Sequence, residues 1–475
     1  MKNNIRVRFA PSPTGFMHLG NVRAALLNYL FAQQHKGTFI LRIEDTDEQR
    51  NIQEATLQIF QDLRWLNLRY QEGCDAGGDF GPYQQSERKH LYDQVLVNLI
   101  ELTRVYRCFC SPEILEEKRQ QQIAAHKPPR YDRTCLHLSS DKVQRKLEAG
   151  LKFIWRFQFN NNQLLDMHDL AKGTITFDTQ HFSDFAVTRE DGSHTFIFAN
   201  FVDDYLMRIS HVIRGEDHTS NTALQLALYD ALAVKAPTFW HLPIICNLEG
   251  TKLSKRDFGF SLGDLRKAGY LPEAICNYLA IIGGSFEQEI QGLDELVKNF
   301  NFSHIPSSSG IRYDVEKLTW FNHKWINKIS NDDLCERIKP FLHASLPQSK
   351  TLDDAILSKL VEKVKSELHK LEDIAKLLGF YFQEPVRDNA LLTLAMPQEK
   401  IEPAFEILRT TATQCSTKES FLSEIKSAAK TAGLSIKEIF TPLRFMLTGT
   451  THGIGIQDLL EMLDFNVVQE RILKS

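Results

Sequence analysis

The chain has 475 residues, of which 43% are hydrophobic and 24% charged, a composition typical of a soluble globular protein with two to four domains. Its 56 basic and 60 acidic residues give a net charge of −4, so charge alone does not indicate nucleic-acid binding; a nucleic-acid-binding protein of this charge would have to gather its Lys and Arg on one face. No run approaches the roughly 18–20 apolar residues of a membrane helix, and residues 1–8 do not form a signal peptide, so we expect a cytoplasmic protein without membrane association.

The N-terminal segment shows strand and helix patterns in turn. Residues 6–10 alternate as a strand does and enter the turn 11–15, where two prolines and a glycine end the strand. Apolar residues at helical spacing follow over 22–33, and a second strand pattern covers 38–43. This order predicts the start of a doubly wound α/β nucleotide-binding fold.

The middle of the chain interrupts this pattern. Residues 105–194 combine short strand patterns with a charged helix over 113–125, which indicates an insertion in the α/β domain. The α/β pattern resumes at Phe196 and leads to a helix over 222–232.

The C-terminal third has helical patterns. Helices are expected over 418–431 and 456–463. A longer amphipathic helix is expected where apolar residues recur every three or four positions. Its stripe comprises Leu357, Leu360, Val361, Val364, Leu368, Leu371, Ile374 and Leu378.

A short motif, His18-Leu19-Gly20-Asn21, stands between the proline-rich turn and the first helix. A helix N-terminus presents unpaired N–H groups and partial positive charge, and therefore attracts phosphate. His18 can donate to a phosphoryl oxygen, and Gly20 lets an adenine ring approach the backbone. Taken alone, the motif is explained more simply by a capping turn.

A second motif, Lys252-Leu253-Ser254-Lys255-Arg256, follows a glycine turn. Three cations within five residues suit a mobile loop that closes over a triphosphate. Taken alone, such a run is ordinary solvated surface.

Together and in this order, the two motifs resemble the His-Ile-Gly-His and Lys-Met-Ser-Lys-Ser signatures of class I aminoacyl-tRNA synthetases. The flanking segments resemble bacterial glutamyl-tRNA synthetases in particular. These segments are 8–15 (RFAPSPTG), 42–47 (RIEDTD), 202–204 (VDD), 213–218 (IRGEDH), 271–274 (LPEA) and 443–449 (LRFMLTG). Glutaminyl enzymes and the archaeal and eukaryotic glutamyl enzymes have Pro-Pro-Glu-Pro in place of Ala-Pro-Ser-Pro, and the truncated relatives that modify queuosine lack the C-terminal third.

The resemblance covers nearly the whole chain and implies a multidomain α/β plus all-α fold. Its parts would be a Rossmann-like catalytic domain over 1–104 and 195–250, an inserted acceptor-stem-binding domain over 105–194, a stem-contact region over 251–325 and a helical anticodon-binding region over 326–475.

The resemblance also implies a two-step reaction. ATP, with Mg²⁺, would activate L-glutamate to glutamyl-adenylate, and the glutamyl group would pass to the 3′ end of tRNA-Glu. Such chemistry depends on alignment and charge stabilisation more than on covalent help. The expected catalytic residues are His18, Lys252 and Lys255, and the expected ATP-binding residues are Thr14, Gly15, His18, Gly20, Asn21 and Lys255. Those expected to bind glutamate are Arg8, Ser12, Glu44, Phe196, Asn200 and Arg214.

Charge explains several of these roles. Arg8 and Arg214 would grip the two carboxylates of glutamate, because a guanidinium fork suits a carboxylate. An arginine facing the amide of glutamine would pair badly, so glutamate would be preferred. Glu44 would pair with the α-ammonium, unless Arg42 is its partner.

One position departs from the family pattern. Where the family usually has Pro-Thr-Tyr, this chain has His194-Thr195-Phe196 and lacks the tyrosine hydroxyl that reaches the amino acid. Either the pocket tolerates the loss, with His194 or a water in its place, or the chain is a specialised second copy with altered preference.

Three of the eight cysteines are grouped. Cys108-x-Cys110 and Cys135-x-His137 are two close pairs of zinc-ligand types, which can complete a tetrahedral shell. A matching element occurs in zinc-binding members of the family, so the resemblance implies a structural Zn²⁺, with Tyr131 as the alternative to His137. The isolated cysteines are expected to be buried thiols; they are Cys74, Cys246, Cys276, Cys335 and Cys415.

Two alternatives to a tRNA-Glu-specific ligase stay open. The enzyme could also charge tRNA-Gln with glutamate, and the sequence does not identify the residue that reads the third anticodon base. A paralogue that binds tRNA without aminoacylating would not need Arg8, His18, Arg214 and Lys255, all of which are present. We expect a monomer.

Overall fold

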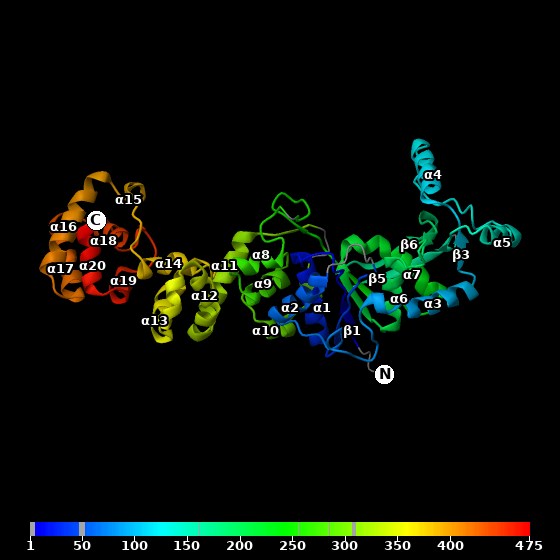
Figure 1. The fold of residues 1–475 in the computed structure, drawn as a ribbon, viewed down its shortest axis with the longest axis horizontal. Coiled ribbons are helices and arrows are strands. Elements are labelled where there is room, and N and C mark those ends of the chain that lie inside the picture. The colour runs from blue at the N-terminus through cyan, green and yellow to red at the C-terminus, as the bar shows by residue number, and fades with distance from the viewer. Residues whose placement is uncertain (1–4, 47–52, 161, 255, 285, 306–309) are drawn as a thin grey trace. The chain divides into compact units, whose positions relative to one another are not determined.

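The computed structural model describes residues 5–46, 53–160, 162–254, 256–284, 286–305 and 310–475, so Lys255 lies outside the described residues. The chain divides into two compact units: residues 1–264 with 275–315, and residues 265–274 with 316–475 (Figure 1). None of the described helices is long and apolar enough to cross a membrane.

The N-terminal strand–helix–strand is the first part of the first unit. Strand β1 (Arg6–Phe9) pairs in parallel with β2 (Thr38–Leu41), and α1 (Leu19–Gln34) connects them. Helix α1 packs against both strands and against β8 (His211–Gly215). These elements confirm the expected start of an α/β fold, although the helix begins three residues before the expected position.

A four-stranded sheet in the order β6-β5-β9-β8 lies beside them. The hairpin of β5 (Leu164–Asp169) and β6 (Gly173–Asp178) is antiparallel, whereas β9 (Thr238–Leu242) runs parallel to both β5 and β8. A hairpin from the segment 105–194 therefore shares a sheet with the strand that carries Arg214.

Smaller sheets and helices complete the first unit. The strands are β3 (Val105–Cys108), β4 (Ile154–Phe157) and β7 (Phe185–Ala186) in one sheet, and β10 (Ile245–Cys246) with β11 (Ile311–Arg312) in another. The helices are α2 (Gln53–Trp65), α3 (Lys89–Glu101), α4 (Pro112–Ala124), α5 (Ser140–Glu148), α6 (Phe196–Leu206), α7 (Thr219–Ala231) and α10 (Leu293–Asn299). Helices α8 (Leu262–Lys267) and α9 (Pro272–Ile281) each have residues in both units.

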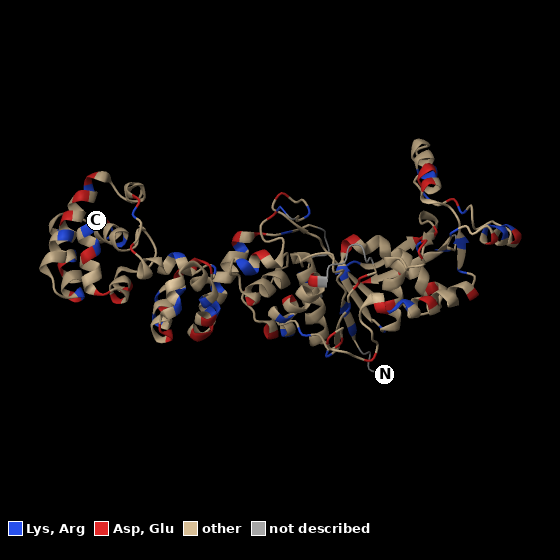
Figure 2. Ribbon diagram, in the orientation of Figure 1, with Lys and Arg blue, Asp and Glu red and all other residues tan. Residues whose placement is uncertain are grey.

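Helix α4 has no buried residue, and the same is true of α5. Basic and acidic residues both occur along α4 (Figure 2), and Arg119 forms an ion pair with Glu116 at 3.1 Å.

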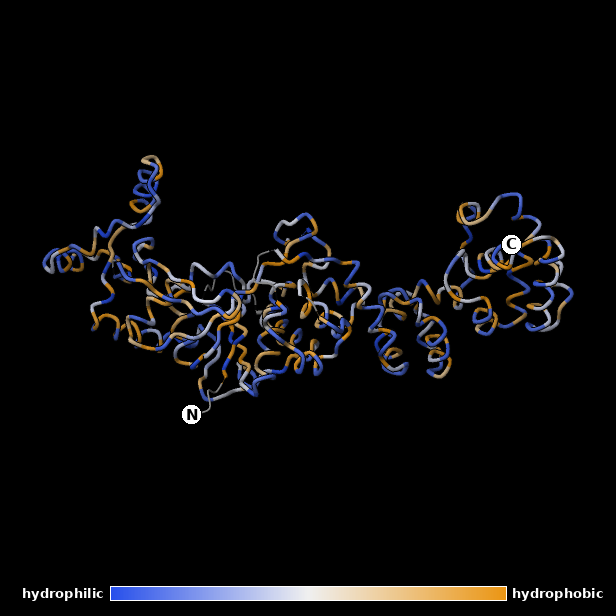
Figure 3. Tube along the Cα trace, turned by 180° about the vertical axis from the view of Figure 1, so that it is seen from behind, coloured by the Kyte–Doolittle hydropathy of each residue, from blue (hydrophilic) through white to orange (hydrophobic). Residues whose placement is uncertain are grey.

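The second unit is helical. Its helices are α11 (Val315–Lys328), α12 (Asn331–Ser345), α13 (Asp354–Val364), α14 (Asp373–Phe382), α15 (Asn389–Ala395), α16 (Gln398–Gln414), α17 (Lys418–Thr431), α18 (Ile436–Thr448), α19 (Ile456–Met462) and α20 (Phe465–Lys474). In Figure 3 hydrophobic and hydrophilic residues alternate along the C-terminal helices, as amphipathic packing requires. Helices α17 and α19 confirm two sequence predictions.

The prediction of one long helix over 357–378 was wrong. The stripe divides between α13 and α14, with a 3₁₀ turn at Lys365–Glu367. The helix is interrupted because backbone groups of residues 369–371 form hydrogen bonds outside it. The N–H of Leu371 donates to the carbonyl of Gly269, and the Asn322 amide donates to the carbonyl of His369 at 2.7 Å.

The prediction that the isolated cysteines are buried is confirmed for three of the five. Cys246, Cys276 and Cys335 are buried, Cys415 is half-buried and Cys74 is exposed. Cys74 lies in the segment between α2 and α3.

Candidate active site

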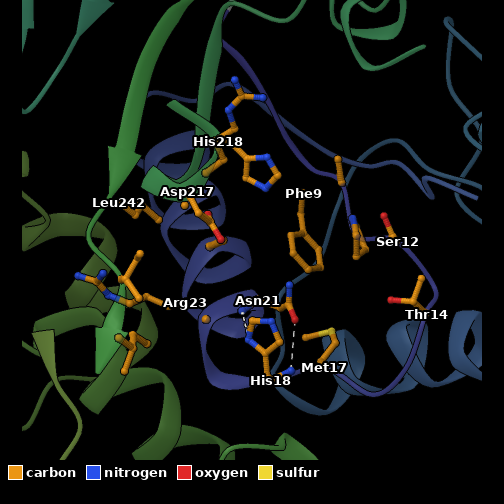
Figure 4. A pocket seen from close by; sticks show the side chains of 18 of the residues that line it. Phe9, Ser12, Thr14, Met17, His18, Asn21, Arg23, Asp217, His218 and Leu242 are labelled. Atoms are coloured by element: carbon orange, nitrogen blue, oxygen red, sulfur yellow. Dashed lines mark hydrogen bonds between the residues drawn. The ribbon is translucent and has the colours of Figure 1, made fainter. Parts of the chain in front are cut away.

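A cavity of about 910 Å³ lies in the first unit, at the N-terminus of α1 and the carboxyl end of β8. Figure 4 shows Ser12 and Thr14 on one side of it and Asp217 and His218 on the other. The expected site residues that line it are Arg8, Ser12, Thr14, Gly15, His18, Gly20, Asn21, Glu44, Phe196, Asn200, Arg214 and Lys252. The cysteines 108, 110 and 135 do not line it.

His18 is the N-cap of α1. Its Nδ1 accepts from the backbone N–H of Asn21 at 3.3 Å, and the Asn21 side chain accepts from the His18 N–H (Figure 4). Burial, and then the charge of Lys252, lowers the pKa of His18, so the ring is neutral near pH 7. A neutral ring whose Nδ1 accepts carries its proton on Nε2, which makes Nε2 a donor. A Cβ on Gly20 would lie 2.9 Å from the His18 ring, so a side chain there would displace it.

The segment that follows the second motif lies against this helix start. The ring of Phe260 stacks on His18 with centroids 5.2 Å apart. The backbone N–H of Leu19 donates to the carbonyl of Phe260, and that of Leu262 to the carbonyl of Met17. The segment directly after the second motif thus contacts the first motif, and Phe260 is a contact that sequence reasoning missed.

Lys252 is more exposed. Its Nζ lies 3.2 Å from Oδ2 of Asp217, and both side chains are about half exposed to solvent. Burial alone would raise the pKa of Asp217, but the bond from Lys252 and the charge of His218 keep it low. An exposed pair of this kind is weak, typically about 0–1 kcal/mol, so a ligand can separate it at little cost.

Arg8 and Arg42 share one buried carboxylate at the other end of the cavity. Asp204 accepts from Nε of Arg8 at 3.0 Å and from Nη1 of Arg42 at 2.7 Å. Burial by itself would raise the pKa of Asp204, but the two arginines outweigh burial and lower it. Asp204 is therefore an anion that keeps both guanidinium groups in place.

Glu44 is paired with Arg42, the partner left open by the sequence. Its Oε1 lies 2.8 Å from Nη2 of Arg42 and also accepts from the Asn200 amide at 2.6 Å. The Oε2 atom takes part in none of these bonds. Burial raises the pKa of Glu44, with Arg42 acting in the opposite direction.

Asn200 continues the chain of bonds to Arg214. Its carbonyl oxygen accepts from Gln225 at 2.6 Å, and the Gln225 oxygen accepts from Nη2 of Arg214 at 2.8 Å. Burial lowers the pKa of Arg214 to about 10, so it stays charged at neutral pH. Its buried Nε has no hydrogen-bond partner among the described residues.

Phe196 and His194 differ in their position relative to the cavity. Phe196 lines the cavity, with its ring centroid 6.1 Å from that of His218. His194 is buried, stacks on Phe198 and lies 3.3 Å from Asp93. Among the described residues, His194 is not one of those that line the cavity.

The grouped cysteines form a separate cluster. The Sγ atoms of Cys108, Cys110 and Cys135 lie within 4.8 Å of one another, in a group that does not include His137. The hydroxyl of Tyr131 lies 3.3 Å from Sγ of Cys108 and 3.7 Å from Sγ of Cys110. Three sulfurs and a phenol oxygen thus point at a common centre.

Comparisons with known proteins agree along the whole chain. A family model described as "tRNA synthetases class I (E and Q), catalytic domain" matches residues 4–320, and one described as "Anticodon binding domain" matches residues 333–475. A protein of Bacillus licheniformis named "Glutamate--tRNA ligase" is 36% identical over 485 residues and 99% of each chain. "Glutamate--tRNA ligase 2" of Syntrophus aciditrophicus is 38% identical over 99% of this chain and 97% of its own.

A solved structure is also similar over its whole length. The crystal structure of a glutamate tRNA ligase from Elizabethkingia meningosepticum, in complex with its amino acid, is 32% identical with a TM-score of 0.88 and covers 99% of both chains. The matches and the α/β and helical architecture together show that the chain belongs to the class I tRNA synthetases of the E and Q type, with bacterial glutamate–tRNA ligases as full-length relatives.

Proposed function

We propose that this protein is a glutamate–tRNA ligase, which activates L-glutamate with ATP and transfers it to the 3′ end of tRNA-Glu. One observation carries the proposal. A single cavity has two buried guanidinium groups, Arg8 and Arg214, at one end and the histidine-capped N-terminus of α1 at the other. Such a cavity suits a small dicarboxylate beside a nucleotide triphosphate.

The buried end would select glutamate. The buried Nε of Arg214 has no partner in the part of the chain that the structure describes, and a ligand carboxylate can satisfy it. Glu44 has an oxygen outside the Arg42 and Asn200 bonds, which suits the α-ammonium. Glutamine would place an amide N–H₂ against a donor-only arginine, a mismatch that can give discrimination of as much as ~10⁴. Ser12 and Phe196 would complete the wall of this site.

The other end would hold the nucleotide. An oxygen of the glutamate α-carboxylate attacks the α-phosphorus of ATP, and the bond from that phosphorus to the bridging oxygen breaks, releasing pyrophosphate. Nε2–H of His18 would donate to a phosphoryl oxygen, next to Thr14, Gly15, Gly20 and Asn21, while Lys252 would leave Asp217 to meet phosphate charge. Mg²⁺ bound with ATP would neutralise further phosphate charge.

The transfer step uses the same site. The terminal ribose hydroxyl of the tRNA attacks the carbonyl carbon of the adenylate, and AMP leaves with the electrons of the broken bond. The hydroxyl proton passes to the released phosphate or to water. The protein supplies alignment in both steps.

Pyrophosphate exchange tests the proposal. With tRNA-Glu present, exchange between ATP and labelled pyrophosphate should require glutamate. Lys255→Ala should reduce this exchange by ~10²–10³-fold, because the lysine would act on transition-state charge. Wild-type protein without glutamate-dependent exchange would reject the function, and a mutant with only a raised KM for ATP would reject the role of Lys255.

We propose a structural zinc ion at Cys108, Cys110 and Cys135. Three sulfur donors within 4.8 Å of one another fit Zn²⁺, and the position of Tyr131 supports it over His137 as the fourth ligand. The purified protein should contain about one zinc per chain, lost in Cys108→Ser and weakened in Tyr131→Phe but not in His137→Ala. Zinc-free protein purified without chelators would exclude the site.

The choice of tRNA is tested by charging tRNA-Glu and tRNA-Gln side by side. We propose that tRNA-Glu is the substrate, and equal charging of both would identify a non-discriminating enzyme. We further propose that the protein is cytoplasmic and monomeric. Light scattering of the free protein checks the oligomeric state.

A further inference from the structure

A buried row of polar side chains extends from Arg214 through Thr222 and His241 to Asp169. Oδ2 of Asp169 lies 2.9 Å from Nδ1 of His241, Nε2 of His241 lies 2.9 Å from Oγ1 of Thr222, and Oγ1 of Thr222 lies 2.7 Å from Nη2 of Arg214. All four side chains are buried. The row begins at the end of β5, crosses β9 and ends on β8, by way of α7.

The carboxylate end of this row is fixed. Besides the His241 ring, Asp169 accepts from three backbone N–H groups, those of Ala171, Lys172 and His241, at 2.9–3.0 Å. Burial alone would raise the pKa of Asp169, but the bonds from His241 and the backbone lower it. Burial lowers the pKa of His241, so a carboxylate faces a neutral ring.

The order of the protons follows from these charge states. The ionised Asp169 can only accept, so Nδ1 of His241 carries the ring proton and Nε2 has a lone pair. That lone pair lies 2.9 Å from Oγ1 of Thr222, so the hydroxyl proton points to it rather than to the more distant carbonyl of His218 at 3.2 Å. The free lone pairs of Thr222 then accept from Arg214.

We propose that Asp169, His241 and Thr222 form a hydrogen-bonded relay that positions Arg214 for its carboxylate ligand. Each bond polarises the next, so the hydroxyl oxygen becomes a stronger acceptor for the guanidinium. Thr222 and Gln225 together engage Nη2, which leaves for the ligand the Nε atom that has no partner among the described residues. The relay deepens the proposed function and depends on it for the identity of the ligand. Its three members are positioning residues.

Thr222 offers the sharpest test. Thr222→Val keeps the shape and removes the hydroxyl, and it should raise the KM for glutamate about tenfold or more, since a bond to a charged group is lost. The KM for ATP should change little, and the melting temperature should fall because Nε2 of His241 loses its buried partner. Thr222→Ser restores the hydroxyl and should restore the KM for glutamate. Thr219→Val is the control, because the Thr219 hydroxyl donates to the Glu216 carbonyl one turn away, outside the relay, and its loss should leave the KM unchanged.

A second measurement needs neither substrate nor variant activity. Nitrogen-15 NMR of the wild-type protein should find His241 neutral, with its proton on Nδ1 and Nε2 bare. A proton on Nε2, or a normal KM for glutamate in Thr222→Val, would overturn the relay. Absence of glutamate-dependent exchange in the wild type would reject the proposed function instead, and the NMR result would still decide the proton order.

Discussion

Around Arg8 and Arg214 the polar side chains are buried and bonded to one another, whereas around Ser12, Thr14 and Lys252 they are exposed. The first region has low solvent access, where an unpaired charge is expensive. Arg8 pairs there with the carboxylate of Asp204, whereas Arg214 is bonded to the neutral side chains of Thr222 and Gln225 and is left to pair with a ligand. The second region has solvated hydroxyl groups in a turn, at Ser12 and Thr14, and a solvated charge in a loop, at Lys252. The end of the cavity at Arg8 and Arg214 is therefore formed before the ligand binds, whereas the end at Ser12, Thr14 and Lys252 is completed by the ligand.

The two regions should therefore respond differently to substitution. Removing a charge from the buried region should destabilise the fold as well as binding. Removing a group from the open region should affect the reaction alone.

The largest expected effect is at Arg42. Arg42→Met leaves Glu44 without its cation and Asp204 with only Arg8, so it should reduce the free energy of unfolding by about 3–5 kcal/mol. Denaturant titration measures the change. Arg64→Met is the matched control, because its ion pair with Asp75 is exposed and should contribute only about 0–1 kcal/mol. Equal effects in the two variants would remove the distinction between the regions.

His18→Asn tests the open region. Asparagine also caps helices well, so α1 should keep its stability while the ring donor is lost. We expect glutamate activation to fall by about 100-fold, comparable to the loss of one transition-state donor. Pyrophosphate exchange and thermal unfolding should be measured on the same sample. A large loss of stability would mean that the ring supports the fold and not the reaction.

A lower pH should reduce the free energy of unfolding through His218. Burial, and then the charge of Arg214, lowers the pKa of His218 to about 4. The unfolded chain therefore protonates His218 near pH 6.5, whereas in the folded protein the ring stays neutral until about pH 4. Stability should therefore fall as the pH drops from about 6.5 to about 4, by at most about 1.4 kcal/mol per pH unit for this group. His218→Asn should flatten the dependence over this range. An identical pH profile in the variant would assign the titration to other groups.

The smallest expected effect is at Phe196. Phe196→Tyr would return the hydroxyl usual in the family, and one neutral hydrogen bond contributes about 0.5–1.5 kcal/mol. The KM for glutamate should fall several-fold, with the KM for ATP unchanged. His194 is not on the cavity wall, which removes it as the replacement considered from the sequence. An unchanged or higher KM would mean that a water already fills the role.

Much of the fold followed from local pattern. Strand alternation and helical spacing gave β1, α1 and β2, and α17 was predicted with its observed ends. The same rule failed at 365–372, where the apolar spacing continues but the chain turns. The carbonyl of Gly269 and the amide of Asn322 bind the backbone there, and no local pattern contains their positions.

The site divides in a similar way. The sequence by itself determined the residue types and the two motifs, because a helix cap, a glycine turn and a cationic loop are local features. The tertiary structure alone decided that Phe260 stacks on His18, that Glu44 pairs with Arg42, and that Asp169, His241 and Thr222 stand behind Arg214. These contacts join residues from different strands and helices, and their strength depends on distance and burial, which only the packed chain sets.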